Sequence, residues 1–174
     1  MPVRSPARFA FDRERSYVKI GARSNLHPIT TETRGLSGWI EVAVSPEGTL
    51  DLDVEVRGRL ELSTDRLSSG NRLYDRELHR RIDSRRYPTI EGQIVRVAPS
   101  GGAYLVRGDL SFHGHTRTFE HEMQIRVRED LAIEMTGEYV FDIRQFDMKP
   151  PSMLMLKVYP EVSVRVELHG TRQA

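Results

Sequence analysis

Hydrophobic and polar residues alternate with a period of two along most of this chain. Near the C-terminus, Val162, Val164 and Val166 alternate with polar residues, and Val54 and Ile125 lie in similar segments. Successive side chains of a strand point to opposite faces of a sheet, so the pattern predicts strands with one buried and one solvated face. Parallel strands read as continuous apolar runs, and the alternation therefore favours antiparallel pairing.

Short turn signals divide these segments into candidate strands. Ser45–Gly48 and Pro99–Gly102 have the composition of tight links between neighbouring strands. The predicted strands are 16–24, 34–44, 49–60, 90–98, 103–113, 117–128, 131–141 and 160–170. Short links at regular spacing are typical of an up-and-down meander, which closes most simply into a barrel. We therefore expect an all-β fold, an eight-stranded antiparallel β-barrel, as a single domain over residues 1–174 with an N-terminal extension at 1–15.

An insertion between two of the strands predicts one α-helix over residues 71–86. The Asn71 side chain can cap it, since its oxygen can accept a hydrogen bond from a free backbone amide. Tyr74, Leu78 and Ile82 recur on one face of this helix. The segment also contains six arginines and three acidic residues. This charge indicates either a solvated helix face or a docking patch for an anionic headgroup or a membrane surface.

A second insertion, residues 142–159, is rich in methionine. The pair Pro150 and Pro151 excludes a regular helix at that point, so we expect one short helical turn or an irregular loop over an end of the barrel. Met148, Met153 and Met155 lie near Phe146 in this segment. Methionine adapts to variable apolar shapes, and the cluster predicts either a lid over an entrance or an ordinary plug of one barrel end.

Composition and charge narrow the classes of function. The formal net charge of +1 gives no global attraction to nucleic acid or to a membrane. The absence of cysteine excludes disulfides and cysteine-based metal or redox sites. Residues 1–15 lack the apolar stretch of a secretory signal, and no run approaches the ~20 apolar residues of a membrane span. We therefore expect a cytoplasmic protein without a nucleic-acid partner, and membrane contact that is transient at most.

The sequence gives little support to catalysis. It has no G-x-S-x-G elbow and no phosphate-binding glycine loop, so we expect neither an enzyme nor a cofactor. The exception is His113, His115 and Glu120, which resemble the first cupin motif that binds a metal. Gly114 and Thr116 indicate a turn there, and no second cupin half is visible. We prefer a polar pair on a loop, and keep a metal-assisted enzyme as an alternative.

Several segments resemble the YceI-like family. They are Gly35–Ile40, Asn71–Asp75, Tyr87–Ile90, Tyr104–Arg117 with its Gly108-Asp109-Leu110 and His113-Gly114, and the tail from Pro150 to Val162. No single motif is specific, but their order and spacing extend over about Ser16 to Gly170. The resemblance implies a lipocalin-like, eight-stranded barrel that encloses a polyisoprenoid, fatty-acyl or similar chain. It also allows a homodimer.

The resemblance converts a predicted apolar interior into a predicted ligand site. Alternation alone predicts a packed core as readily as a cavity. The residues predicted to contact the ligand are Ile40, Val42, Leu52, Val54, Val56, Tyr104, Val106, Met123, Ile125, Ile133, Met135, Phe146 and Met153. Tyr104, Arg107, Arg96 and His113 are the candidates for holding a polar head.

We therefore predict non-catalytic binding of a long-chain amphipathic lipid for transport, storage or protection. The metal-assisted enzyme and a packed stress-response or scaffold barrel are the alternatives.

Overall fold

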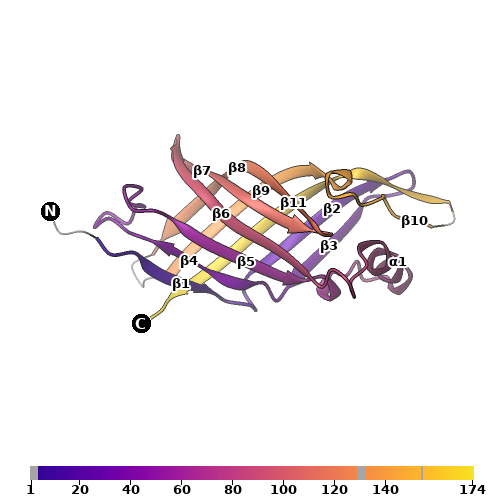
Figure 1. The fold of residues 1–174 in the computed structure, drawn as a ribbon, viewed down its shortest axis with the longest axis horizontal. Helices are drawn as coiled ribbons and strands as arrows, with labels where there is room; N and C mark the ends of the chain where they lie inside the picture. The colour runs from indigo at the N-terminus through magenta and orange to yellow at the C-terminus, as the bar shows by residue number, and fades with distance from the viewer. Residues whose placement is uncertain (1–3, 129–131, 154) are drawn as a thin grey trace.

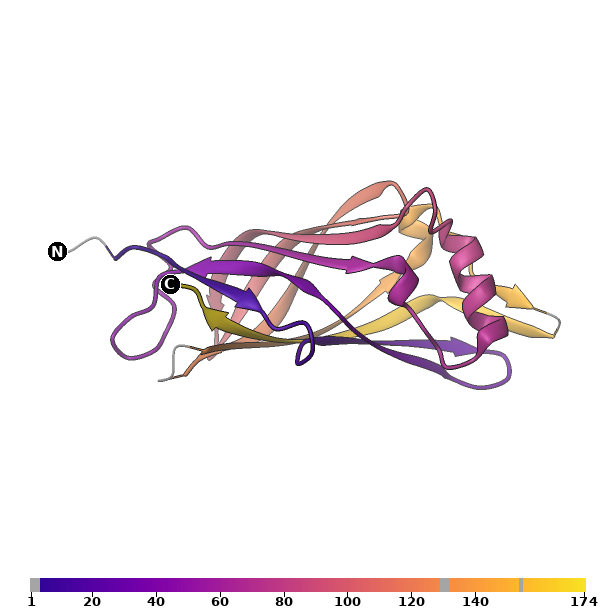
Figure 2. The same cartoon turned by 90° about the horizontal axis from the view of Figure 1, so that it is seen from below.

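The alternating segments fold into antiparallel strands that close into an elongated barrel, with one helix across an end (Figures 1 and 2). The computed structural model describes residues 4–128, 132–153 and 155–174, apart from the side chain of Met153. The strands are β1 (Ala7–Phe11), β2 (Tyr17–Ser24), β3 (Ile29–Arg34), β4 (Ser37–Val42), β5 (Arg57–Ser63), β6 (Thr89–Ser100), β7 (Ala103–Phe112), β8 (His115–Val127), β9 (Ala132–Asp142), β10 (Ser152–Met153) and β11 (Leu156–Arg172). The predicted fold class, an eight-stranded antiparallel barrel with one helix, is confirmed.

The barrel closes where β1 meets β11. The hydrogen-bonded order is β1-β4-β5-β6-β7-β8-β9-β11, and β1 also pairs with β11. β2 lies beyond β1, and β3 beyond β4, on the side of the helix end. β2 pairs with residues 158–167 of β11, whereas β1 pairs with residues 170–172 of the same strand. Phe9 and Phe11 of β1 are buried, so residues 7–11 belong to the barrel rather than to the predicted extension.

Two predicted strands are interrupted. The segment 34–44 becomes the end of β3 and all of β4, because Gly35, with a φ of +92°, turns the chain between them. The segment 49–60 forms only an isolated bridge from Leu50 to Val44 before β5 begins. After Leu50, the Asp51 carboxylate accepts a hydrogen bond from the amide of Asp53, which turns the chain away from an extended path. The strand prediction over 51–56 was therefore wrong.

The inserted helix is shorter than predicted but starts where expected. α1 spans Arg72–Ile82, and the Asn71 side chain accepts hydrogen bonds from the amides of Leu73 and Tyr74. The helix ends at Asp83 in the left-handed conformation, before the predicted limit. The second insertion contains the expected short helical turn, η2 (Ile143–Phe146), and another, η1 (Thr64–Arg66), precedes α1. In the part of the chain that the structure describes, no helix is both long and apolar enough to cross a membrane.

The end of the barrel that carries the chain termini is packed solid. Phe9, Ile40, Val42 and Ile133 are fully buried there, and Phe9 is the cross-strand partner of Ile40. Gly170 allows this packing, since a Cβ atom at that position would lie 2.7 Å from Ile133 Cγ2. Side chains therefore fill this end of the barrel.

Candidate ligand-binding cavity

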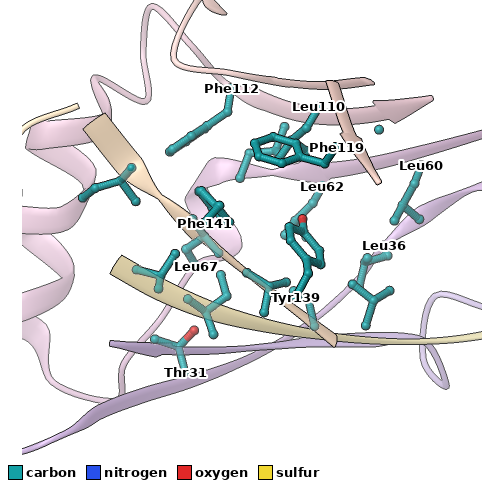
Figure 3. A pocket seen from close by; sticks show the side chains of 18 of the residues that line it. Thr31, Leu36, Leu60, Leu62, Leu67, Leu110, Phe112, Phe119, Tyr139 and Phe141 are labelled. Carbon is teal, nitrogen blue, oxygen red and sulfur yellow. The ribbon is translucent and has the colours of Figure 1, made fainter. Parts of the chain in front are cut away.

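A cavity of about 340 Å³ lies inside the barrel toward the helix end (Figure 3). Its walls come from most strands of the barrel, from α1 and from the segment after η2. The volume is near the lower end of the ~300–1,000 Å³ typical of small-molecule sites. The lining is almost wholly aliphatic and aromatic, so its main interaction with a ligand would be hydrophobic.

One wall is aliphatic and is formed by β11 and β2. Their register places Val166 opposite Val18 and Val164 opposite Ile20. All four residues line the cavity. Because side chains alternate along each strand, the intervening Arg165 is exposed on the outside. The valine alternation of the C-terminal segment thus builds a smooth apolar surface.

The adjoining wall, formed by β9 and β8, is aromatic, and its Tyr139 is the direct cross-strand partner of Val164. Phe119 on β8 and Tyr139 and Phe141 on β9 line the cavity, with ring centroids 6.1 Å apart for Phe119 and Tyr139 and 5.8 Å for Tyr139 and Phe141. Phe146 of η2 lies behind them and is fully buried. Its ring centroid is 5.9 Å from that of Phe119 and 5.6 Å from that of Phe141. These rings fix one another, so the wall is preformed without a ligand.

Two polar side chains are part of this aromatic wall. His121 stacks on Tyr139 with ring centroids 4.8 Å apart and an interplanar angle of 27°. Burial lowers the pKa of His121 and raises the pKa of Tyr139 to about 12, so both side chains are neutral near pH 7. The Tyr139 hydroxyl points into the cavity (Figure 3). The interior therefore offers uncharged hydrogen-bonding groups and suits neutral ligand atoms.

The charged residues along the lining have partners that keep them out of the interior. Glu77 binds Arg80 and Arg81, and these hydrogen bonds lower its pKa to about 2. The Arg59 side chain binds Glu61 and Glu91, while the Asp109 carboxylate accepts a hydrogen bond from Thr118. Their charges are thus satisfied outside the apolar space.

α1 covers the end of the cavity with its apolar face. Tyr74, Leu78 and Ile82, the three residues predicted to share a face, all line the cavity. Met148 and Leu156 complete this end beside the helix. The predicted methionine lid is represented by the buried Met148, whereas Met155 is exposed to solvent and the side chain of Met153 lies outside the described residues.

The predicted contact residues divide between the cavity and the packed end. Val106, Met123 and Met135 line the cavity. The others whose side chains are described lie outside the lining: Ile40, Val42, Ile125, Ile133 and Val56 are buried, Leu52, Val54 and Tyr104 are partly buried, and Phe146 supports the aromatic wall from behind. For the residues on strands the direction of the side chain was predictable, but its position along the barrel axis was not, and residues 52–56 are not on a strand.

The predicted polar head group site does not form. Arg96 and Arg107 are cross-strand neighbours with exposed side chains, since Val106 takes the inward position beside Arg107. The Tyr104 hydroxyl accepts a hydrogen bond from the Leu50 amide instead. His113 occupies the turn between β7 and β8, where its Nδ1 donates to the Phe146 carbonyl at 2.9 Å.

The residues of the metal alternative are separated in the same way. His113 has a φ of +53° on its turn, and His115 Nε2 lies 3.9 Å from an Asp147 carboxylate oxygen. Glu120 is exposed, next to the inward Phe119 on β8. Within residues 4–128, 132–153 and 155–174, no three histidine, cysteine or acidic residues lie close enough together to hold a metal.

Sequence reasoning missed the aromatic wall. Phe119, His121 and Met123 have the same parity on β8, so the inward prediction for Met123 extended logically to the other two. Tyr139 and Phe141 are similarly related to Met135 on β9, through alternate positions. The signal was therefore present, although a histidine within it concealed the apolar pattern.

The comparisons with known proteins agree with this architecture. The model of the YceI-like domain matches residues 9–170. Burkholderia cenocepacia BcnA superposes with a TM-score of 0.76 at 17% identity, over 92% of this chain and 99% of that one. A polyisoprenoid-binding domain from Saccharophagus degradans, implicated in plant cell wall breakdown, gives 0.73 at 11% identity, over 95% and 98%.

A YceI protein from Campylobacter jejuni gives a TM-score of 0.62 at 11% identity, over 87% of this chain and 85% of that one. At these identities the solved structures establish the shared fold alone. A search of curated protein sequences gave no match.

Proposed function

Because this chain belongs to the YceI-like family, we propose that it binds a polyisoprenoid or similar long-chain lipid inside its barrel, without catalysing a reaction. The observation that carries the proposal is the preformed apolar cavity, which is lined by the aliphatic wall of β11 and β2 and by the adjoining aromatic wall of β8 and β9. A domain with the same fold is named for polyisoprenoid binding, which supports this choice among apolar ligands. Transport, storage or protection of the lipid would each need only reversible binding.

Hydrophobic desolvation is the expected source of affinity. Each buried methylene contributes about 0.8 kcal/mol, so a ten-carbon chain would gain about 8 kcal/mol before the cost of association. That cost is on the order of 4–15 kcal/mol, so tight binding requires a longer chain than this. A ligand of that kind would run between Val164 and Phe119 and approach the helix end near Leu78.

The lining also restricts the polar part of the ligand. Burying an ionised group without a partner is costly, and His121 and Tyr139 are both neutral near pH 7. A charged head would therefore stay at the α1 end in contact with water. An uncharged hydroxyl or carbonyl group could instead enter and bond to the Tyr139 hydroxyl.

The proposal predicts that filling the cavity weakens ligand binding. Val166→Trp puts a large ring into the cavity, because Val166 lines it beside its cross-strand partner Val18. We expect it to weaken binding of farnesol, a short isoprenoid alcohol, by at least ~10-fold, which corresponds to losing about two buried methylenes. Isothermal titration calorimetry measures the affinity, and a negative heat-capacity change would report apolar burial.

Arg165→Trp is the matched control, since it places the same ring on the neighbouring, outward-facing position of β11. It should bind farnesol as the unmodified chain does. Equal affinity for the unmodified, Val166→Trp and Arg165→Trp proteins, all folded by circular dichroism, would show that the ligand does not occupy the cavity. No binding of farnesol or of longer isoprenoids to the unmodified chain would refute lipid binding.

A further inference from the structure

Exposed apolar side chains gather at the helix end of the barrel. Leu26, Leu73 and Met155 are 60%, 61% and 80% exposed, respectively. They come from the β2–β3 turn, the first turn of α1 and the β10–β11 connection. Figures 1 and 2 both show these three elements projecting at the same end, opposite the chain termini. We call Leu26, Leu73 and Met155 the apolar rim.

Contacts between the three elements hold the apolar rim together. The Asn25 side chain donates to the Met155 carbonyl at 2.8 Å and accepts from the Lys157 amide at 2.7 Å. On its other side, the His27 ring lies 3.5 Å from the Tyr74 hydroxyl. The β2–β3 turn, which carries Leu26, is thus attached both to the start of β11 and to α1.

Basic side chains come from the same segments as the apolar rim or from segments next to them. They are Arg23, Arg72, Arg76, Lys149 and Lys157, all exposed and none in an ion pair among the residues that the structure describes. The nearby acidic side chains of α1 already have partners. Asp75 accepts hydrogen bonds from Ser68 and Ser69, and Glu77 binds two arginines. Asp147, also exposed at this end, lies near His115. The balance of charge around the rim is positive.

We propose that this end of the barrel docks on the surface of an anionic lipid bilayer, with the apolar rim inserted among the headgroups. Apolar side chains flanked by lysine and arginine are the combination that binds such an interface, because burial of the apolar groups adds to attraction by the lipid charge. The inference rests on the proposed function and deepens it. The rim lies at the helix end of the cavity, where Tyr74 and Leu156, the neighbours of Leu73 and Met155, line it, so docking there would let an apolar chain move between bilayer and barrel without crossing water.

Vesicle sedimentation with the full chain tests the proposal. Vesicles of phosphatidylcholine with phosphatidylglycerol should sediment the protein, and pure phosphatidylcholine should sediment much less. High salt should release the protein, since screening shortens the range of the attraction. Replacing Leu26 and Leu73 by Asp should lower partitioning by at least ~10-fold, because it removes apolar insertion and adds like charge.

Two controls isolate the rim. Val95→Asp alters a side chain that is 50% exposed on the outer wall, in β6, and should leave partitioning unchanged. For charge, Arg72→Gln with Arg76→Gln should weaken sedimentation, whereas Arg126→Gln with Arg165→Gln, an equal loss of exposed charge on the barrel wall, should weaken it much less.

Several results would overturn the docking proposal: no sedimentation with anionic vesicles, equal sedimentation with neutral ones, or equal losses in the rim and wall variants. Rim substitutions that change the sedimentation coefficient of the free protein, but not vesicle binding, would identify a surface for a second copy and also overturn it. Farnesol binding measured on the same preparations separates the two proposals. Retained farnesol binding with no vesicle binding refutes docking alone, and loss of both refutes the lipid-binding function.

Discussion

Tyr139 and His121 define the chemistry of the interior through burial rather than through a charged partner. Both rings belong to the aromatic wall, and both are held in the uncharged form near pH 7. Because burial lowers the pKa of His121, protonation of this side chain is less favourable in the folded protein than in the unfolded chain. The pKa of histidine in the unfolded chain is about 6.5, so this difference in pKa changes the free energy of unfolding just below neutral pH.

Stability should therefore fall as the pH drops from 7 toward 5, in part through His121. Its folded pKa is lowered, so the stabilisation is complete above the unfolded pKa and is lost as the pH falls below it. His121→Phe keeps a stacked ring but cannot be protonated. Thermal unfolding of this variant should show a shallower decline of Tm over that range than the unmodified chain. An identical decline in both proteins would contradict the assignment.

Single residues show where sequence reasoning reached its limit. Val106, Met123 and Met135 were predicted to face inward and line the cavity. Ile40 and Ile133 have the same parity and burial but fill the packed end. Alternation specifies the face of a strand on which a side chain lies. It carries no information about whether that level of the barrel is filled or open, since this depends on neighbours such as Phe9 and Gly170 from distant segments.

α1 is the element that converts an open barrel end into a covered one. Its apolar face of Tyr74, Leu78 and Ile82 lies over the cavity, and its outer face carries Arg72 and Arg76. A helix of eleven residues is marginal on its own, so its stability depends on this packing and on its cap. Changes at the cap should thus affect access to the cavity more than they affect the stability of the strands.

Asn71→Ala should loosen α1 without unfolding the barrel. It removes the acceptor for two backbone amides at the helix start, at a cost of about 1 kcal/mol. Hydrogen exchange should become faster in residues 72–82 and stay unchanged in β8 and β9. Asn71→Asp is the matched control, because aspartate caps equally well. Equal acceleration throughout the strands of the Asn71→Ala protein would show that α1 is not a separately stable cover.

The elements with strong local signals were predictable. The cap at Asn71, the periodic helix face and the long strands β7 and β8 follow directly from their own residues. The strand interrupted at Asp51 was not, because a hydrogen bond from the Asp53 amide competed with an alternation that otherwise indicated a strand. β1 was also missed, since its five residues are too few for a clear alternation. They are recognisable as a strand only from their pairing with β4 and β11.

The whole molecule has two chemically distinct ends. The end with the termini is closed by fully buried side chains, whereas the other holds the cavity, the cover formed by α1 and the exposed apolar rim. Because only one end holds the cavity, a ligand would enter the barrel beside α1, and its inner end would lie against the packed end. Neither the net charge nor the overall hydropathy of the chain indicates this asymmetry, because both are averages over residues from the two ends.

Native mass spectrometry of the full chain, purified without detergent and then extracted with organic solvent, tests the central claim most directly. We expect a bound species that adds several hundred daltons to the ~20 kDa chain, as long-chain lipids do, and that is recovered in the organic phase as a long-chain lipid. It should be absent from the Val166→Trp protein and present in Arg165→Trp. A bare protein mass that persists after incubation with isoprenoids and fatty acids would contradict the account.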